Sequence, residues 1–141
     1  MQRRYRLKKS AEFQRVRALK RSWAHPLMVL YVAPNDLEIV RVGISTSKRI
    51  GKAVVRNRAK RLIREAVRLL LPRLAPGHDL VFVARPAIAE ADFEEVGRAV
   101  EVLLRRARML SQPSQAPRER GLGKRDEMDK ADPQVDRPLL D

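Results

Sequence analysis

The sequence predicts an α+β fold in which helices pack on one small β-sheet. Residues 38–46 alternate between apolar side chains and charged or small ones, as a half-buried strand does. Residues 79–85 are apolar on both faces, which is typical of a central strand. Residues 54–70 and the stretch that begins at Asp92 instead repeat apolar side chains every three or four positions, which indicates amphipathic helices.

The first helix is expected directly after a basic arm of nine residues. Ser10 is the expected N-cap, because its hydroxyl can accept a hydrogen bond from the first helical turn. Phe13, Val16 and Leu19 would then share one apolar face. The helix must end before Pro26, because the residue that precedes a proline is pushed out of the helical region.

Two strands follow, over residues 27–33 and 38–46, with a Pro-Asn-Asp turn signal between them. The second strand turns its valines and isoleucine toward the core. Its opposite face carries only Arg41 and small residues. We expect this open face of the sheet to accept a ligand.

The last helix begins at Asp92, which has the spacing of a capping box with Glu95. Six apolar residues form its expected buried stripe: Phe93, Val96, Val100, Leu103, Leu104 and Ala107. Beyond residue 110 come four prolines and only scattered apolar side chains. We therefore expect one domain over residues 1–110 and a disordered C-terminal tail over residues 111–141.

The charge of the chain points to a polyanionic partner. The chain has 31 basic and 17 acidic residues, a net charge of +14, and residues 1–110 alone hold 25 basic and 10 acidic ones. Such a balance favours nucleic acid, or less specifically an anionic membrane surface. The absence of cysteine excludes disulfides and thiolate chemistry. With no signal peptide and no long apolar run, a cytoplasmic protein is expected.

The strongest functional signal is the run SKRIGKAVVRNRAKRLIREAVR at residues 47–68, which holds nine basic residues and one acid. Arg56, Lys60, Arg64 and Arg68 stack at i,i+4 spacing, where like charges repel by about 0.2–0.5 kcal/mol per pair. A solvated helix face is the ordinary explanation of a basic run, but such a face would interleave acids with the bases. This pattern is better explained by a polyanion that neutralises it.

Catalysis by the protein itself finds little support in the sequence. His25 and His78 lie in loops, and neither has a partner at the spacing of a metal pair. No glycine-rich phosphate loop is present. A cap and a solvated face explain the carboxylates of the last helix, which are Asp92, Glu94, Glu95 and Glu101. We therefore expect no catalytic residue and no metal ligand in the protein.

The basic run, preceded by RVGIST, resembles the signature of the protein subunit of bacterial ribonuclease P, with its Arg-Asn-Arg triplet at residues 56–58. Three further blocks match that family in order and spacing, namely LKKSAEFQRV, LYV and DLVFVARP. The resemblance covers about residues 5–110, so that residues 1–110 are expected to form a ribonuclease P protein-type RNA-binding domain.

The resemblance implies an α-β-β-β-α-β-α sandwich with a small mixed sheet and a left-handed βαβ crossover. It thus adds a short strand, which we expect near residues 23–27. It also implies an RNA-binding subunit of an endoribonuclease. In that family a catalytic RNA with Mg²⁺ removes the 5′ leader from precursor tRNA. The protein binds the catalytic RNA and the leader, supports substrate and Mg²⁺ binding, and holds no metal tightly itself.

Carried over by position, the resemblance assigns two sets of RNA-binding residues. The set expected to face the catalytic RNA consists of Lys48, Arg49, Lys52, Arg56, Asn57, Arg58, Lys60, Arg61, Arg64 and Arg68. The set expected to line the leader cleft, between the first helix and the open sheet face, consists of Lys8, Lys9, Phe13, Arg17 and Tyr31. From the sequence pattern alone, a core position is favoured for Phe13, whereas Tyr31 could equally be a core residue or a base-stacking one.

Two positions depart from the family pattern. Arg17 stands where many relatives have a second aromatic residue, and Lys20 stands where a glycine often ends the first helix. Two other functions remain open at this point. One is a ribosomal or general RNA-binding protein, and the other is a free-standing nuclease that uses the carboxylates of the last helix.

Overall fold

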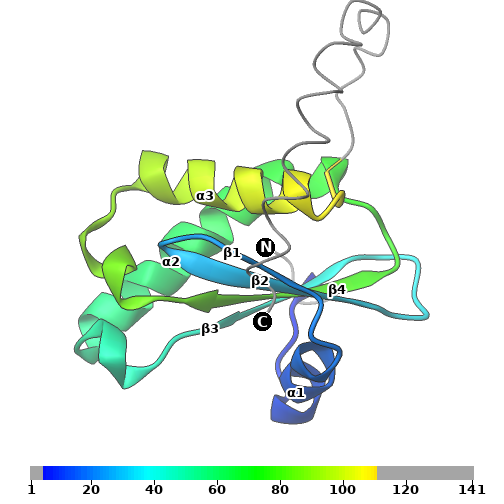
Figure 1. Cartoon of the computed structure of the whole chain (residues 1–141), viewed down its shortest axis with the longest axis horizontal. Helices are drawn as coiled ribbons and strands as arrows, with labels where there is room; N and C mark the ends of the chain where they lie inside the picture. Colours follow the sequence, from blue (N-terminus) through cyan, green and yellow to red (C-terminus); the bar gives the residue numbers. More distant parts are fainter. Residues whose placement is uncertain (1–4, 111–141) are drawn as a thin grey trace, which may run out of the picture.

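The computed structural model describes residues 5–110, which form a sandwich around one small sheet (Figure 1). Helices α2 and α3 cover one face of the sheet, and α1 lies against the other. The helices are α1 (Ser10–Ala18), α2 (Ala53–Leu70) and α3 (Phe93–Arg106), and the strands are β1 (Ser22–Ala24), β2 (Met28–Pro34), β3 (Arg41–Ser45) and β4 (His78–Ala84). This arrangement confirms the α+β prediction. The tail predicted for residues 111–141 lies outside the described residues.

The sheet is mixed, with the strand order β1-β2-β4-β3. Strands β1, β2 and β4 pair in antiparallel fashion, whereas β3 pairs with β4 in parallel. Strand β1 is the short extra strand that the resemblance implied, and it begins one residue earlier than expected. It ends at Ala24 because His25 and Met28 exchange backbone hydrogen bonds and close a tight turn before β2.

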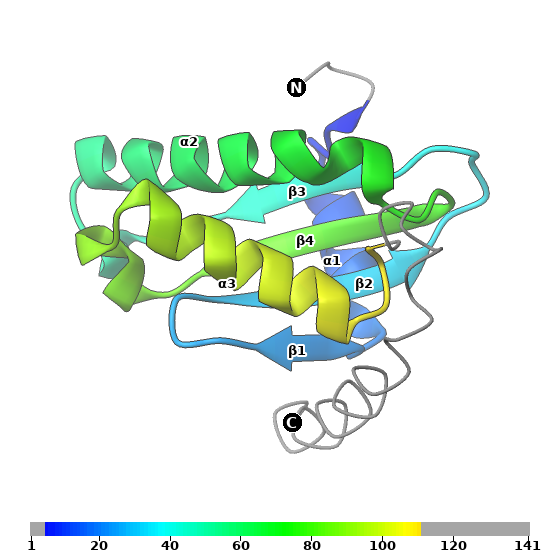
Figure 2. The same ribbon diagram turned by 90° about the horizontal axis from the view of Figure 1, so that it is seen from above.

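The connection from β3 through α2 to β4 joins neighbouring parallel strands. Figure 2 views the sheet from the side of α2 and α3, so α2 lies nearer to the viewer than the strands. An observer who turns that view until both strands point upward sees β4 to the left of β3. The crossover is therefore left-handed, as the resemblance implied and against the right-handed rule that holds for about 98% of such units.

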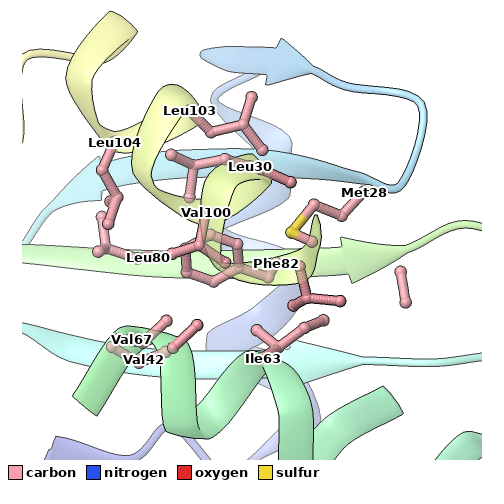
Figure 3. Packing of buried hydrophobic residues seen from close by; sticks show 14 of the residues in the cluster. Met28, Leu30, Val42, Ile63, Val67, Leu80, Phe82, Val100, Leu103 and Leu104 are labelled. Carbon is pink, nitrogen blue, oxygen red and sulfur yellow. The ribbon is translucent and has the colours of Figure 1, made fainter. Parts of the chain in front are cut away.

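The main core lies between the sheet and the two helices that cover it (Figure 3). Strand alternation points Leu30 of β2 and Phe82 of β4 toward these helices, and the two residues are directly paired in the sheet. Helix α2 contributes Ile63 and Val67, whose i,i+4 spacing places them on one face. From α3 come Val96, Ala99, Val100, Leu103 and Leu104, all buried.

The ends of the helices differ in part from the sequence predictions. The capping box of α3 is confirmed, because Asp92 Oδ1 accepts from the Glu95 amide at 2.8 Å and Glu95 Oε1 accepts from the Asp92 amide at 2.9 Å. The prediction that Ser10 is the N-cap of α1 was wrong. Lys9 takes that extended position, and Ser10 is already helical. Lys20 adopts a left-handed backbone (φ +55°), so it fills the glycine-like position despite its side chain.

Three apolar residues expected on buried helix faces are exposed. Phe93 is 39% exposed, because it is the first residue of α3 and precedes the turn that packs on the core. Leu19 is exposed at the C-cap of the short helix α1, outside the helix itself. Leu69, in the last turn of α2, is likewise exposed, although it is one of the apolar residues whose repeat predicted an amphipathic helix over residues 54–70 with these residues on one side.

Candidate RNA-binding surfaces

Helix α2 buries one narrow face and exposes cations around the rest of its circumference. Its fully buried face consists of Ala59, Ile63, Ala66 and Val67. Six residues of the predicted catalytic-RNA set are exposed on the helix, at its N-cap and on the short 3-10 turn η2 (Lys48–Ile50) before it: Lys48, Arg49, Lys52, Asn57, Arg61 and Arg68. The remaining four, Arg56, Arg58, Lys60 and Arg64, are half-buried.

The only acidic residue of α2 is Glu65, which pairs with Arg68 at its own end of the helix. The Arg68 Nε atom lies 3.1 Å from Glu65 Oε1, and this hydrogen bond lowers the pKa of the Glu65 carboxyl. Both side chains are exposed, so the pair adds little to stability. Among the cations of α2, only Arg68 forms an ion pair with Glu65.

The two arginines of the Arg-Asn-Arg triplet contact the protein itself. Arg56 Nη1 donates to the Gly51 carbonyl at 3.0 Å, which fastens the loop before α2. Arg58 Nη2 donates to the Ala91 carbonyl at 2.8 Å, at the junction between η4 (Pro86–Glu90) and α3. Each guanidinium has five N–H donors, so further donors remain for a ligand. Asn57, between them, is exposed.

On the opposite face of the sheet, α1 packs over β2 and β4 around a second, smaller core. Val16 is fully buried there, and Phe13 packs against the same cluster. The Phe13 ring lies directly on Gly43 of β3, where a Cβ atom would be only 2.6 Å from Phe13 Cζ. Glycine is therefore required for this close approach.

Two residues of the predicted leader set are brought together at the exposed border of α1. The Arg17 guanidinium lies over the Tyr31 ring, 5.3 Å from its centroid, which is a cation–π geometry. Lys8 and Lys9 are exposed at the N-terminal end of the same helix. The five residues of the predicted leader set thus lie on or beside α1. Phe13 faces β3, and the Arg17–Tyr31 pair lies on the β2 side.

A buried carboxylate fastens α1 to the sheet, and sequence analysis missed it. Asp79 of β4 is fully buried and accepts hydrogen bonds from Arg41 (Nε–Oδ1 3.0 Å, Nη2–Oδ2 2.8 Å) and from Asn35 (Nδ2–Oδ1 2.7 Å). Arg15 of α1 also pairs with Asp79, and Glu12 pairs with Arg41 at 3.2 Å. The hydrogen bonds with Asp79 raise the pKa of the Arg41 guanidinium above its ordinary value.

The network pairs the single cation that the sequence places on the open sheet face. Arg41 is held by two carboxylates, and α1 covers much of the face. A signal for the network was present in the sequence, since an aspartate at the head of a strand that is apolar on both faces must find a partner when buried. Its partner could not be identified, because Arg41 and Asp79 are 38 positions apart.

Within residues 5–110, no group of three or more histidine or acidic side chains is placed to hold a metal ion. His25 instead accepts a hydrogen bond from the Leu27 amide through Nδ1 at 3.0 Å. Burial, and then the nearby Arg106 and Arg85, lower the pKa of His25. In the same part of the chain no helix is both long and apolar enough to cross a membrane.

Comparison with known proteins identifies the family. A family model described as Ribonuclease P matches residues 1–108. The ribonuclease P protein component of Roseiflexus castenholzii is 50% identical over 108 residues, which cover 76% of this chain and 88% of that protein. The solved RNase P protein of Staphylococcus aureus superposes with a TM-score of 0.71 at 32% identity and covers 76% of this chain and 98% of that one.

The RNase P protein of Thermotoga maritima gives a TM-score of 0.64 at 27% identity, covering 71% of this chain and 96% of that one. The order of strands and helices, the basic helix α2 and the matches over nearly the full length of these relatives agree with one another. The chain belongs to the ribonuclease P protein family, whose members act with a ribonuclease P RNA as the endoribonuclease that matures the 5′ end of tRNA.

Proposed function

We propose that the chain presents two separate RNA surfaces, one to the catalytic RNA and one to the 5′ leader of precursor tRNA. The observation that carries the first is the distribution of charge on α2, where the buried face is narrow and a single acid stands among the cations. The ten residues of the catalytic-RNA set would contact phosphates. Mg²⁺, on which the family implies that the holoenzyme depends, would be held mainly by the RNA.

The second surface would lie along α1, where Phe13 and the Arg17–Tyr31 pair flank the helix. A base of a single-stranded leader can stack on an aromatic ring or on a guanidinium plane, and each such base contributes about 1–3 kcal/mol. Arg17 would thus replace, in part, the second aromatic residue of the family pattern. Lys8 and Lys9 would contact the leader phosphates.

Tyr31→Ala tests the leader surface. The assembled complex of catalytic RNA and protein should bind precursor tRNA about 5- to 150-fold more weakly, which corresponds to the loss of one stacked base. Binding of mature tRNA, which has no leader, should not change. Tyr31→Phe is the matched control, because it keeps the ring. Equal losses for precursor and mature tRNA would mean that Tyr31 only packs against α1.

Salt dependence tests the α2 surface. Each residue that neutralises an RNA phosphate adds about 0.7–0.9 to the slope of log affinity against log salt concentration. Arg61→Gln and Arg68→Gln should each flatten that slope for the catalytic RNA, and excess protein should restore cleavage. Arg98→Gln, an exposed position on α3, is the control. An unchanged slope in both α2 variants would remove this helix from the RNA interface.

The assignment as a whole is tested by cleavage of precursor tRNA in Mg²⁺ with RNA alone, protein alone and both together. We expect the protein alone to be inactive and the pair to exceed the RNA alone at low Mg²⁺. Cleavage by the protein alone would instead support a free-standing nuclease.

We further propose that residues 1–110 form the RNA-binding domain and that the protein works in the cytoplasm. A chain that ends after Ser111 should keep its melting temperature and its affinity for the catalytic RNA. A fall of many degrees in the melting temperature would show that the domain extends farther.

A further inference from the structure

We infer that Arg6, Lys8, Lys60 and Arg64 form a pocket for one RNA backbone phosphate, where the α2 surface meets the α1 surface. The pocket has a volume of about 350 Å³ and is lined by these four residues together with Leu7, Phe13, Val42 and Ile44. This inference extends the proposed function, since it adds a specific site at the junction of the two proposed surfaces.

The N-terminal segment reaches the pocket by adding to the edge of the sheet. The Leu7 amide donates to the Val42 carbonyl at 2.8 Å, and Arg6 pairs with Val42 in a parallel bridge. Alternate residues of an extended segment point to opposite sides. Leu7 is therefore buried in the α1 core, whereas Arg6 lies close enough to Arg64 of α2 to affect its ionisation.

Helix α2 supplies the opposite wall. Lys60 and Arg64 are four positions apart, so their side chains project from the same face of the helix toward the β3 edge. Phe13, which belongs to the proposed leader surface, forms part of the pocket floor with Val42 and Ile44. Residues from α1, β3, α2 and the N-terminal segment thus meet at one point.

The polar groups of the pocket are matched to an anion. Four of the eight lining residues are cationic and none is acidic. The Arg6 Nε atom is buried and has no hydrogen-bond acceptor within the described part of the chain. A buried donor without an acceptor is uncommon in native proteins. A phosphodiester would supply the missing acceptor and two anionic oxygens.

The electrostatic interactions among the cations also favour a bound anion. Burial, and then the Arg6 cation, lower the pKa of Arg64, which means that the charged form of Arg64 is disfavoured in the empty pocket. Arg6, Lys60 and Arg64 are half-buried, so solvent screens their charges less than those of fully exposed side chains. A bound phosphate would remove this repulsion, so binding should also hold the N-terminal segment against β3.

Inorganic phosphate is the first probe, with the full chain and melting temperature as the readout. At equal ionic strength, phosphate should raise the melting temperature more than chloride does, because it binds only the folded chain. Arg6→Gln and Arg64→Gln should each weaken phosphate binding by about tenfold or more, while Arg98→Gln should keep the wild-type response.

In chloride, the two pocket variants should be at least as stable as the wild type, because each removes one of the repelling charges. A phosphate response equal to the chloride response, or one that is the same in Arg6→Gln and Arg98→Gln, would overturn the inference. The two independent pocket variants guard against a folding defect in either one.

RNA binding then distinguishes the source of the phosphate. If it comes from the catalytic RNA, Arg6→Gln should weaken assembly and leave the preference for precursor over mature tRNA unchanged. If it comes from the leader, the same variant should lower that preference and leave assembly intact. No change in either measurement would refute an RNA phosphate at this site. The proposed function fails separately, when Arg61→Gln and Tyr31→Ala leave RNA binding unaffected.

Discussion

Replacing Asp79 by alanine should destabilise the protein more than any exposed ion pair could. Asp79 is fully buried and neutralises Arg41, whose side chain is only 22% exposed. Removing one partner of a buried ion pair costs about 3–5 kcal/mol, because the other charge is left without compensation. Arg41 retains some solvent access and its contact with Glu12, so we expect the lower end of that range, about 3 kcal/mol.

Chemical denaturation at fixed pH measures this loss of unfolding free energy directly. In a thermal scan it should lower the melting temperature by about 12–24 °C in a domain of this size. Asp79→Ala combined with Arg41→Ala should cost less than the sum of the two single variants, since neither member of the Arg41–Asp79 pair is then left without the other. Arg15 and Glu12 also lose a partner in the double variant, but both are more exposed than Asp79. Glu65→Ala, which breaks only the exposed pair with Arg68, is the matched control and should leave the melting temperature nearly unchanged.

The same variant should also loosen α1, because Arg15 and Glu12 connect that helix to the network. We therefore expect weaker binding of precursor tRNA with assembly largely intact at temperatures where the variant is folded. A stability loss below about 1 kcal/mol, or additive costs in the double variant, would refute the reasoning. Either result would mean that Arg41 finds full compensation in solvent or in Glu12.

Three further outcomes are expected. Lys20→Gly should raise the free energy of unfolding in urea by about 1 kcal/mol, because Lys20 has φ +55°; no gain would mean that its side chain makes a compensating contact. Gly43→Ala should lower the free energy of unfolding by about 1–3 kcal/mol, because the new Cβ would lie 2.6 Å from Phe13. Adding Phe13→Leu to the Gly43→Ala variant should recover part of this loss. If the loss is instead unchanged by Phe13→Leu, the clash is not with the ring. The free energy of unfolding should also decrease as the pH is lowered below about 6.5, the ordinary pKa of histidine. Burial and Arg106 lower the folded-state pKa of His25, so below that pH the unfolded chain binds more protons than the folded one. His25→Asn should flatten this pH profile, and an equally steep profile in that variant would assign it to other groups.

Periodicity was sufficient to predict the elements that span the core. Strand β4 is apolar on both faces, and it is central in the sheet because β2 and β3 flank it. The capping box at Asp92 set the start of α3 correctly, since the reciprocal bonds involve residues only three positions apart. Strand β1 has three residues, too few to show any alternation, so only the family resemblance suggested it.

The site was predictable where its chemistry is local and not where it depends on tertiary contacts. The concentration of cations on α2 follows from the sequence alone. The pairing of Arg41 with Asp79 does not, because it depends on the parallel register that places these two residues opposite one another. The pocket under Arg6 likewise requires the N-terminal segment to add to β3, and no sequence pattern specifies that edge.

The two arginines of the Arg-Asn-Arg triplet have structural contacts besides the RNA contacts that we propose for them. Arg58 donates to a carbonyl 33 positions away and thereby fixes the start of α3 relative to α2, while Arg56 fixes the loop that carries Lys48 and Arg49. Loss of RNA binding in Arg58→Ala would therefore have two physical causes, a missing charge and a displaced helix. Arg61 is exposed and has no such contact within the described residues, so its substitution reports on RNA alone. The difference in RNA affinity between Arg58→Ala and Arg61→Ala therefore measures how far the proposed α2 surface depends on the contact that fixes α2 relative to α3.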